Sequence, residues 1–211
     1  MSTEQDLRQE IVDIVDELFA MDMITSTGGN VSARIPEEEG AFLITPTRLH
    51  KGGLTPDLIV KINGKGKSCK RGQRPSVETK VHLAIYAACP DIEAAIHSHA
   101  KMCTVLGLIN GTVPPICVEA VSFEHTQIVP YGLPGTPELC ENVVRALERS
   151  PAVLLQNHGL LTVGWTVRHA ANRAIGLERI IQMMLACKLF GKEAATIPPD
   201  ALELARSIGA L

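Results

Sequence analysis

Short apolar runs typical of strands intermix with helical segments along the whole chain, and this alternation is the feature that most constrains the fold. In the first helical segment, apolar residues recur at helical spacing from Leu7 to Leu18. Strands are expected at residues 41–45, 58–62, 92–99, 153–156 and 160–163, and helices at 77–88, 167–189 and 199–208. No repeat or low-complexity tract interrupts this pattern. We therefore expect one domain over residues 1–211, of α/β or α+β class, with a sheet flanked by helices.

Composition and charge exclude several kinds of protein. The 211 residues are 45% apolar and 20% charged, the balance of an ordinary globular protein. The 20 Lys and Arg against 23 Asp and Glu give a net charge of −3, which argues against binding to nucleic acid or an anionic membrane. Six scattered cysteines without a C-x-x-C pair, and a polar N-terminus that is no secretory signal, predict reduced thiols and a cytoplasmic protein.

The pattern Ile96-His97-Ser98-His99 is the sharpest chemical feature. Alternate residues of a strand point to one face, so the two imidazoles can converge on a metal ion. A third candidate, His158, follows an apolar strand and precedes a glycine, and Glu78 stands at the start of a predicted helix. Each has a plainer interpretation: hydrogen-bonded histidines, a turn histidine, and a carboxylate that complements the helix dipole. Together, nitrogen and oxygen ligands without thiolate would favour Zn²⁺ or another first-row ion such as Mn²⁺ or Co²⁺.

A glycine-rich segment, Thr27-Gly28-Gly29-Asn30, is the second feature. Small residues leave backbone N–H groups exposed, which can hold an anion such as phosphate. The alternative is a tight turn that requires positive φ. The Gly-x-Gly-x-x-Gly pattern of dinucleotide-binding folds is absent.

Five ordered motifs resemble those of the class II aldolase/adducin family, and the nearest relatives in appearance are fuculose-phosphate aldolases. The motifs are Gly28-Gly-Asn-Val-Ser-Ala-Arg34, Leu43-Ile-Thr-Pro-Thr47, Pro75-Ser-Val-Glu78, His97-Ser-His99 and Leu154-Leu-Gln-Asn-His-Gly159. The resemblance implies a three-layer α/β/α sandwich around a mainly antiparallel sheet. It also implies a homotetramer with active sites at subunit interfaces.

The resemblance further implies roles for individual residues. His97, His99 and His158 correspond to zinc ligands, and Glu78 corresponds to an acid/base carboxylate that can also bind the metal. The phosphate of the substrate would be bound by Thr27, Gly28, Asn30, Thr47, Arg48 and Ser76.

The implied reaction is metal-dependent cleavage of a small phosphorylated ketose to dihydroxyacetone phosphate and an aldehyde. The metal would stabilise the enediolate, Glu78 would move the proton, and no Schiff-base lysine is needed. The alternative is a metal-dependent decarboxylase or dehydratase of the same fold acting on a sugar acid or related substrate. A non-catalytic, adducin-like scaffold is disfavoured because all three histidines are retained.

The chain also departs from the family pattern. Arg48 replaces a frequent glycine and Val77 replaces a serine, so a hydroxyl donor is lost while a cation appears nearby. Arg48 could contact a second acidic group, or belong to an exposed basic loop, Arg48-Leu-His-Lys51. The tyrosines that serve as proton donors in fuculose enzymes are missing from residues 116–126 and from the tail. Glu119, Glu124 or His125 could replace them.

Overall fold

A seven-stranded sheet forms the centre of the computed structural model, which describes residues 3–36 and 38–209. The strand order is β3-β2-β1-β4-β7-β6-β5. The strands are β1 (Asn30–Arg34), β2 (Ala41–Ile44), β3 (Val60–Asn63), β4 (Ala94–Ser98), β5 (Gln127–Val129), β6 (Ala152–Leu155) and β7 (Gly159–Gly164). Neighbouring strands are antiparallel except for the parallel pair β5–β6, so the sheet is mixed and mainly antiparallel.

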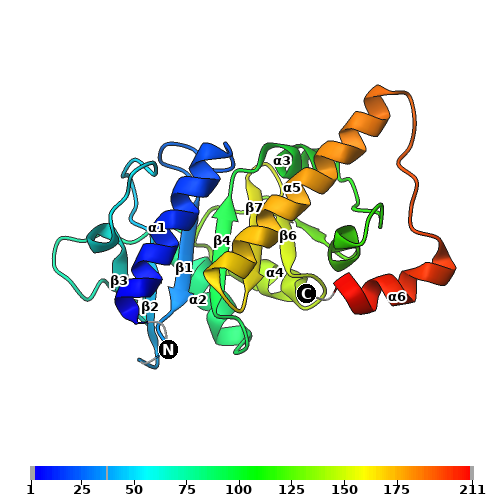
Figure 1. Cartoon of the computed structure of the whole chain (residues 1–211). Helices are drawn as coiled ribbons and strands as arrows, with labels where there is room; N and C mark the ends of the chain where they lie inside the picture. The colour runs from blue at the N-terminus through cyan, green and yellow to red at the C-terminus, as the bar shows by residue number, and fades with distance from the viewer. Residues whose placement is uncertain (1–2, 37, 210–211) are drawn as a thin grey trace.

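Helices cover both faces of the sheet and complete the predicted three layers (Figure 1). One face packs against α1 (Glu4–Ala20), α3 (Lys101–Leu108) and α5 (Val167–Leu189), and the other against α2 (Thr79–Ala88) and α4 (Pro137–Leu147). Strand side chains alternate between the two cores: in β4, Ile96 joins the first core and Ala95 the second. Helix α6 (Pro199–Gly209) lies beside the 3₁₀ helix η2 (Glu119–Phe123), and a second 3₁₀ turn, η1, spans Pro56–Leu58. The predicted α/β sandwich is confirmed.

The element boundaries agree best where local capping signals are strong. Helix α5 spans the predicted residues, and its N-cap Thr166 accepts a hydrogen bond from the His169 N–H at 3.0 Å. Helix α2 begins at Thr79, two residues later than predicted, because Glu78 is its N-cap. Helix α1 ends at Ala20, before the expected Met23.

Helix α3 was not predicted because its cap comes from a distant part of the chain. The buried Glu178 carboxylate of α5 accepts hydrogen bonds from the N–H groups of Met102 and Cys103 at 3.0–3.1 Å. These bonds satisfy free donors at the start of α3. Among the described residues, no helix combines the length and apolar character needed to cross a bilayer.

The strand order brings the motif residues together at one end of the central strands β1, β4 and β7. Asn30 at the start of β1 pairs with His97 near the end of β4, and Ser98 pairs with Leu160 at the start of β7. Thr45 directly follows β2, and its hydroxyl accepts a hydrogen bond from the Val31 N–H at 3.2 Å. Segments separated by more than a hundred residues in sequence therefore meet at this end of the sheet.

Candidate active site

Three histidines converge at this end of the sheet. His97 lies in β4, His99 follows the strand, and His158 lies in the turn between β6 and β7. Their ring centroids are 4.5 to 5.5 Å apart, and one ring nitrogen from each lies within 4.8 Å of the others. The turn at His158 requires Gly159, because a Cβ there would lie 2.3 Å from the Ser98 carbonyl oxygen. The three histidines thus form one cluster; strand alternation predicts the convergence of His97 and His99, and the family resemblance adds His158.

The chemistry of the cluster fits a metal ion. The Nδ1–H group of His97 donates to the Leu160 carbonyl oxygen at 3.0 Å, so its Nε2 atom carries the free lone pair. This Nε2 atom is buried and has no hydrogen-bond partner among the described residues. Burial, with His158 and His99 nearby, holds the pKa of His97 well below its usual value. Burial also lowers the pKa of His99. Neutral imidazoles with inward-facing lone pairs can bind a divalent metal ion.

Glu78 faces the same cluster from the start of α2. Its carboxylate oxygens lie 3.5 Å from Nε2 of His97 and 3.5 Å from Nε2 of His158. The side chain is 10% exposed and makes no capping hydrogen bond to its own helix. The position at a helix start is therefore not sufficient to explain this carboxylate, which lies against two imidazoles.

A cavity of about 170 Å³ opens beside the cluster. Its walls bring together the predicted residues Thr27, Gly28, Asn30, Thr47, Ser76, Glu78, His99 and His158. The tight-turn interpretation of the glycine segment holds at Gly29, whereas the N–H of Gly28 donates to the Thr25 hydroxyl at 2.8 Å. Gly29 has φ +84°. At Gly28, a Cβ would lie 2.6 Å from the His99 ring, so a side chain would intrude on the cluster.

The basic loop after Thr47 differs from the expectation in one respect. Arg48 is exposed, has φ 60° and is not part of the cavity wall. Lys51 was expected to be exposed with it, but that is wrong: Lys51 is 1% exposed and lines the cavity. Its Nζ donates to the Pro46 carbonyl oxygen at 2.7 Å, and burial lowers its pKa to about 8.

Lys51 is turned inward by a long-range backbone contact. Its N–H donates to the Ser26 carbonyl oxygen at 2.8 Å, which fixes this loop against the glycine segment. No local sequence signal indicates that contact. Lys51 is accordingly a candidate site residue that sequence reasoning missed.

The three candidate proton donors do not line this cavity. Glu119 lies in η2, and Glu124, which follows η2, pairs with Arg206 of α6 at 3.0 Å. His125 is also absent from the cavity wall of the single chain.

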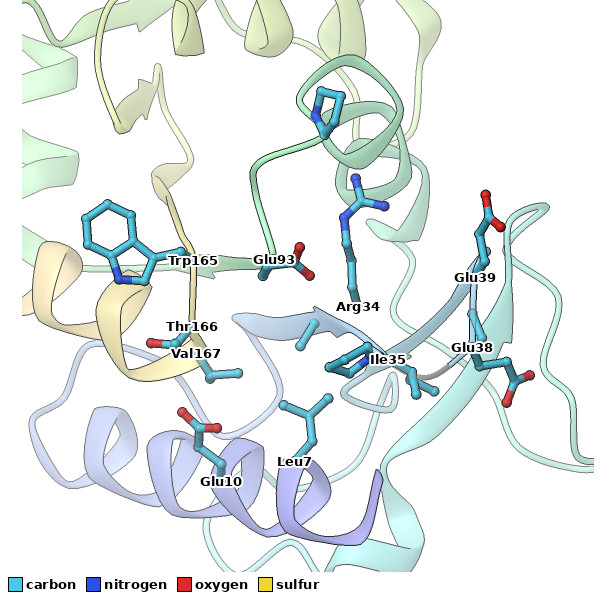
Figure 2. A pocket seen from close by; sticks show the side chains of 15 residues that line it. Leu7, Glu10, Arg34, Ile35, Glu38, Glu39, Glu93, Trp165, Thr166 and Val167 are labelled. Carbon is cyan, nitrogen blue, oxygen red and sulfur yellow. The ribbon is translucent and has the colours of Figure 1, made fainter. Parts of the chain in front are cut away.

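A larger cavity, of about 610 Å³, lies at the opposite ends of the central strands (Figure 2). It is lined by Arg34, Trp165 and the carboxylates of Glu10, Glu38, Glu39 and Glu93. Two of these carboxylates have partners: Glu38 pairs with Lys61 at 2.5 Å, and Glu10 accepts from the Arg168 N–H at 3.1 Å. His99, His158 and the buried Lys51 line the smaller cavity, which is the candidate active site.

Comparison with known proteins agrees with this geometry. A family model described as the Class II Aldolase and Adducin N-terminal domain matches residues 9–185. A 5-methylthioribulose-1-phosphate/5-deoxyribulose-1-phosphate aldolase of Escherichia coli O45:K1 (strain S88) is 34% identical, over 86% of this chain and 84% of that protein. A 3-oxo-tetronate 4-phosphate decarboxylase of Escherichia coli O6:H1 (strain CFT073) is 30% identical, over 86% and 87%.

The likeness extends to solved structures. A structure of L-fuculose 1-phosphate aldolase superposes with a TM-score of 0.87 at 28% identity, covering 98% of this chain and 97% of that one. The family model, the sequence relatives and the fold all point the same way. The chain belongs to the class II aldolase and adducin family and is an enzyme of the class II aldolase type.

Proposed function

We propose that this enzyme cleaves a small phosphorylated ketose to dihydroxyacetone phosphate and an aldehyde in a metal-dependent reaction. The observation that carries the proposal is the cluster of three imidazoles and one carboxylate, of which His97 and Glu78 are buried, beside a cavity lined by hydroxyl groups and a buried ammonium group. The aldolase-named relatives and the fold support the same reaction class.

His97, His99 and His158 would hold the metal, and Glu78 would share it when substrate is absent. A divalent ion such as Zn²⁺ supplies a Lewis acid that stabilises the negative charge of the enediolate. The donor set fits this use because three protein ligands leave a position for substrate. Nitrogen and oxygen donors without thiolate also suit Mn²⁺ or Co²⁺.

Glu78 would carry the proton transfer at C3 of dihydroxyacetone phosphate. When the bond to the aldehyde carbon breaks, its electrons remain on the dihydroxyacetone phosphate fragment, and C3 must then gain a proton. A carboxyl group within reach can give that proton when it is protonated and, in the condensation direction, remove it as the carboxylate. Glu78 is placed for this work, since its carboxylate lies beside the imidazoles and on the cavity wall.

The phosphate of the substrate would lie against the glycine segment. Thr27, Thr47 and Ser76 offer hydroxyl donors there, and Lys51 offers a charge-assisted donor. Lys51 has no carboxylate partner within 4 Å among the described residues, so its charge is available to a bound anion. This assignment gives Lys51 the role that sequence alone suggested for Arg48.

Decarboxylation of a phosphorylated 3-oxo acid is the second candidate. It is favoured by the decarboxylase-named relative at 30% identity. Loss of CO₂ next to a carbonyl leaves the same kind of enolate, so the same cluster would serve both reactions. In the single chain Arg48 is exposed and does not line the cavity, so the second candidate rests on the decarboxylase-named relative and not on a contact of Arg48.

We further infer a homotetramer in which a neighbouring subunit completes each active site. Among the residues that the structure describes, those lining this cavity include no tyrosine and none of the three alternative proton donors. A donor for the aldehyde oxygen would then come from another subunit. Light scattering should show an oligomer, and an active monomer would contradict this arrangement.

The reaction is tested by incubating zinc-loaded protein with dihydroxyacetone phosphate and a panel of aldehydes, followed by identification of the products. The proposal expects a ketose 1-phosphate with at least one aldehyde and none after metal removal. A parallel incubation with phosphorylated 3-oxo acids measures CO₂ release. Release of CO₂ without any condensation product would replace the aldolase with the decarboxylase.

A further inference from the structure

A buried chain of polar side chains leads from Glu78 into the space between β1 and α2. The Asn30 side-chain amide donates to Oε2 of Glu78, and its Oδ1 lies 2.5 Å from Nε2 of His82. The chain continues through Ser32, whose Oγ lies 2.6 Å from Nδ1 of His82 and 2.7 Å from the hydroxyl of Tyr86. Asn30, Ser32, His82 and Tyr86 are all 4% exposed or less.

Two periodicities place these four residues together. Asn30 and Ser32 are alternate residues of β1, so both point toward α2, while Val31 between them joins the opposite core. His82 and Tyr86 are four residues apart in α2 and therefore share one face of that helix. A polar stripe of the sheet thus meets a polar stripe of the helix behind the active site.

The hydrogen bonds can run in only one direction. A carboxylate accepts, so Asn30 must present its NH₂ group to Glu78 and its carbonyl oxygen to His82. His82 must then carry its proton on Nε2. Complete burial lowers the pKa of His82 to about 4, so the ring is neutral and Nδ1 accepts from Ser32. Tyr86 in turn donates to Ser32. Every proton in the chain points toward Glu78.

We propose that His82 is a positioning residue that acts through Asn30 to hold the Glu78 carboxylate in its working orientation. Without the donor at His82, the Asn30 amide is free to turn, and its carbonyl oxygen would then face the carboxylate. Glu78 would lose a charge-assisted hydrogen bond and gain a repulsive neighbour. Because this inference rests on the proposed role of Glu78, its test includes a measurement that needs no turnover.

The kinetic test replaces His82 by leucine and by glutamine. In zinc-loaded protein, His82→Leu should lower kcat about 10- to 100-fold with little change in KM, the size expected for loss of a hydrogen bond to a charged group. His82→Gln keeps an amide donor near the position of Nε2 and should recover most of this loss. In a Glu78→Gln background, His82→Leu should have almost no further effect on kcat.

The matched control is Thr162→Val. Thr162 is fully buried, and its hydroxyl donates to the Ala170 carbonyl oxygen at 2.9 Å, away from Glu78. This variant should lose stability without a comparable loss of kcat. Equal kcat losses in His82→Leu and Thr162→Val that follow their stabilities would reduce His82 to a structural residue. A normal kcat in His82→Leu would also overturn the proposal. If His82→Leu does not fold, Ser32→Ala is used, and it should lower kcat at unchanged zinc content.

The measurement without turnover is the NMR signal of the Asn30 side-chain amide in ¹⁵N-labelled protein, identified by its absence in Asn30→Asp. The signal should be protected from solvent exchange in the parent protein and in His82→Gln, and should lose protection in His82→Leu. Unchanged protection in His82→Leu would contradict the positioning role. If the parent protein shows this protection but no aldolase activity, the proposed reaction fails while the hydrogen-bond chain stands.

Discussion

At the scale of single residues, the site depends on groups whose hydrogen bonds leave one atom free for chemistry. Nδ1 of His97 is bonded to a backbone carbonyl, which leaves Nε2 facing the cluster. The ammonium group of Lys51 donates to one carbonyl oxygen, that of Pro46, and Lys51 lines the cavity. Burying an unpaired imidazole nitrogen or a lysine ammonium group destabilises a protein, so both atoms are expected to serve binding or catalysis.

Replacing any of the three histidines by alanine should release the metal. Removing a residue that only hydrogen-bonds a metal ligand lowers metal affinity roughly 10- to 100-fold, so removing a ligand itself should lower it at least as much. Elemental analysis of His97→Ala, His99→Ala and His158→Ala should find little bound zinc, while circular dichroism shows folded protein. Full zinc occupancy in all three variants would contradict the ligand assignment.

Lys51→Met should weaken binding of a phosphorylated substrate about 10-fold or more, because a charge-assisted hydrogen bond is worth roughly 1.5–3 kcal/mol. The readout is the inhibition constant of inorganic phosphate together with KM for substrate. Lys65→Met, which removes an exposed lysine next to β3, is the control for lost charge. If both variants bound phosphate like the parent protein, Lys51 would not belong to the phosphate site.

At the scale of elements, a turn with a strained backbone follows Thr47 of the cavity wall. Arg48 adopts φ 60°, a left-handed conformation that costs an ordinary residue about 1–2 kcal/mol. The glycine that the family resemblance implies at this position would adopt such a φ without strain. The departure from the family pattern at Arg48 is therefore a matter of backbone conformation as well as of charge.

Arg48→Gly should stabilise the protein by about 0.5–1 kcal/mol, since relief of the left-handed strain exceeds the added freedom of the unfolded chain. Urea unfolding of metal-free protein measures this difference. A lower unfolding free energy in the variant would mean that the Arg48 side chain makes stabilising contacts, for instance with a neighbouring subunit.

Features that depend on local signals could be predicted from the sequence, whereas features that depend on contacts between distant residues could not. The histidine cluster was predictable because strand alternation and an ordered motif pattern both point to it. Helix α5 was predictable from its own cap and periodicity. Helix α3 depends on Glu178, 75 residues from Cys103, and Lys51 is buried by a contact with Ser26. The spacing of Asn30, Ser32, His82 and Tyr86 is visible in the sequence, but polar side chains at such spacing usually mark an exposed face.

At the scale of the whole molecule, burial of neutral histidines couples stability to pH. The ordinary pKa of histidine is near 6.5, whereas burial lowers that of His82 to about 4. Between these values the unfolded chain binds a proton that the folded protein does not. His82 therefore contributes stability above pH 6.5 that is lost progressively as pH falls toward 4.

The free energy of unfolding of metal-free protein should fall between pH 6.5 and pH 4, by roughly 3 kcal/mol from His82 alone. His97 and His99, whose pKa values are also lowered, should add to the decrease. Urea titrations across this range measure the slope, and His82→Gln should make it shallower. A flat profile in the parent protein would show that these histidines are already protonated in the folded state.

The proposed reaction contains one step that can be measured without knowing the aldehyde partner: removal of a C3 proton from dihydroxyacetone phosphate. The direct measurement is ¹H NMR of dihydroxyacetone phosphate in D₂O with zinc-loaded protein. We expect one C3 hydrogen to exchange for deuterium, exchange to stop after metal removal, and exchange to be lost in Glu78→Gln although its zinc remains bound. Exchange at the parent rate in Glu78→Gln, or none in the zinc-loaded parent protein, would contradict the account.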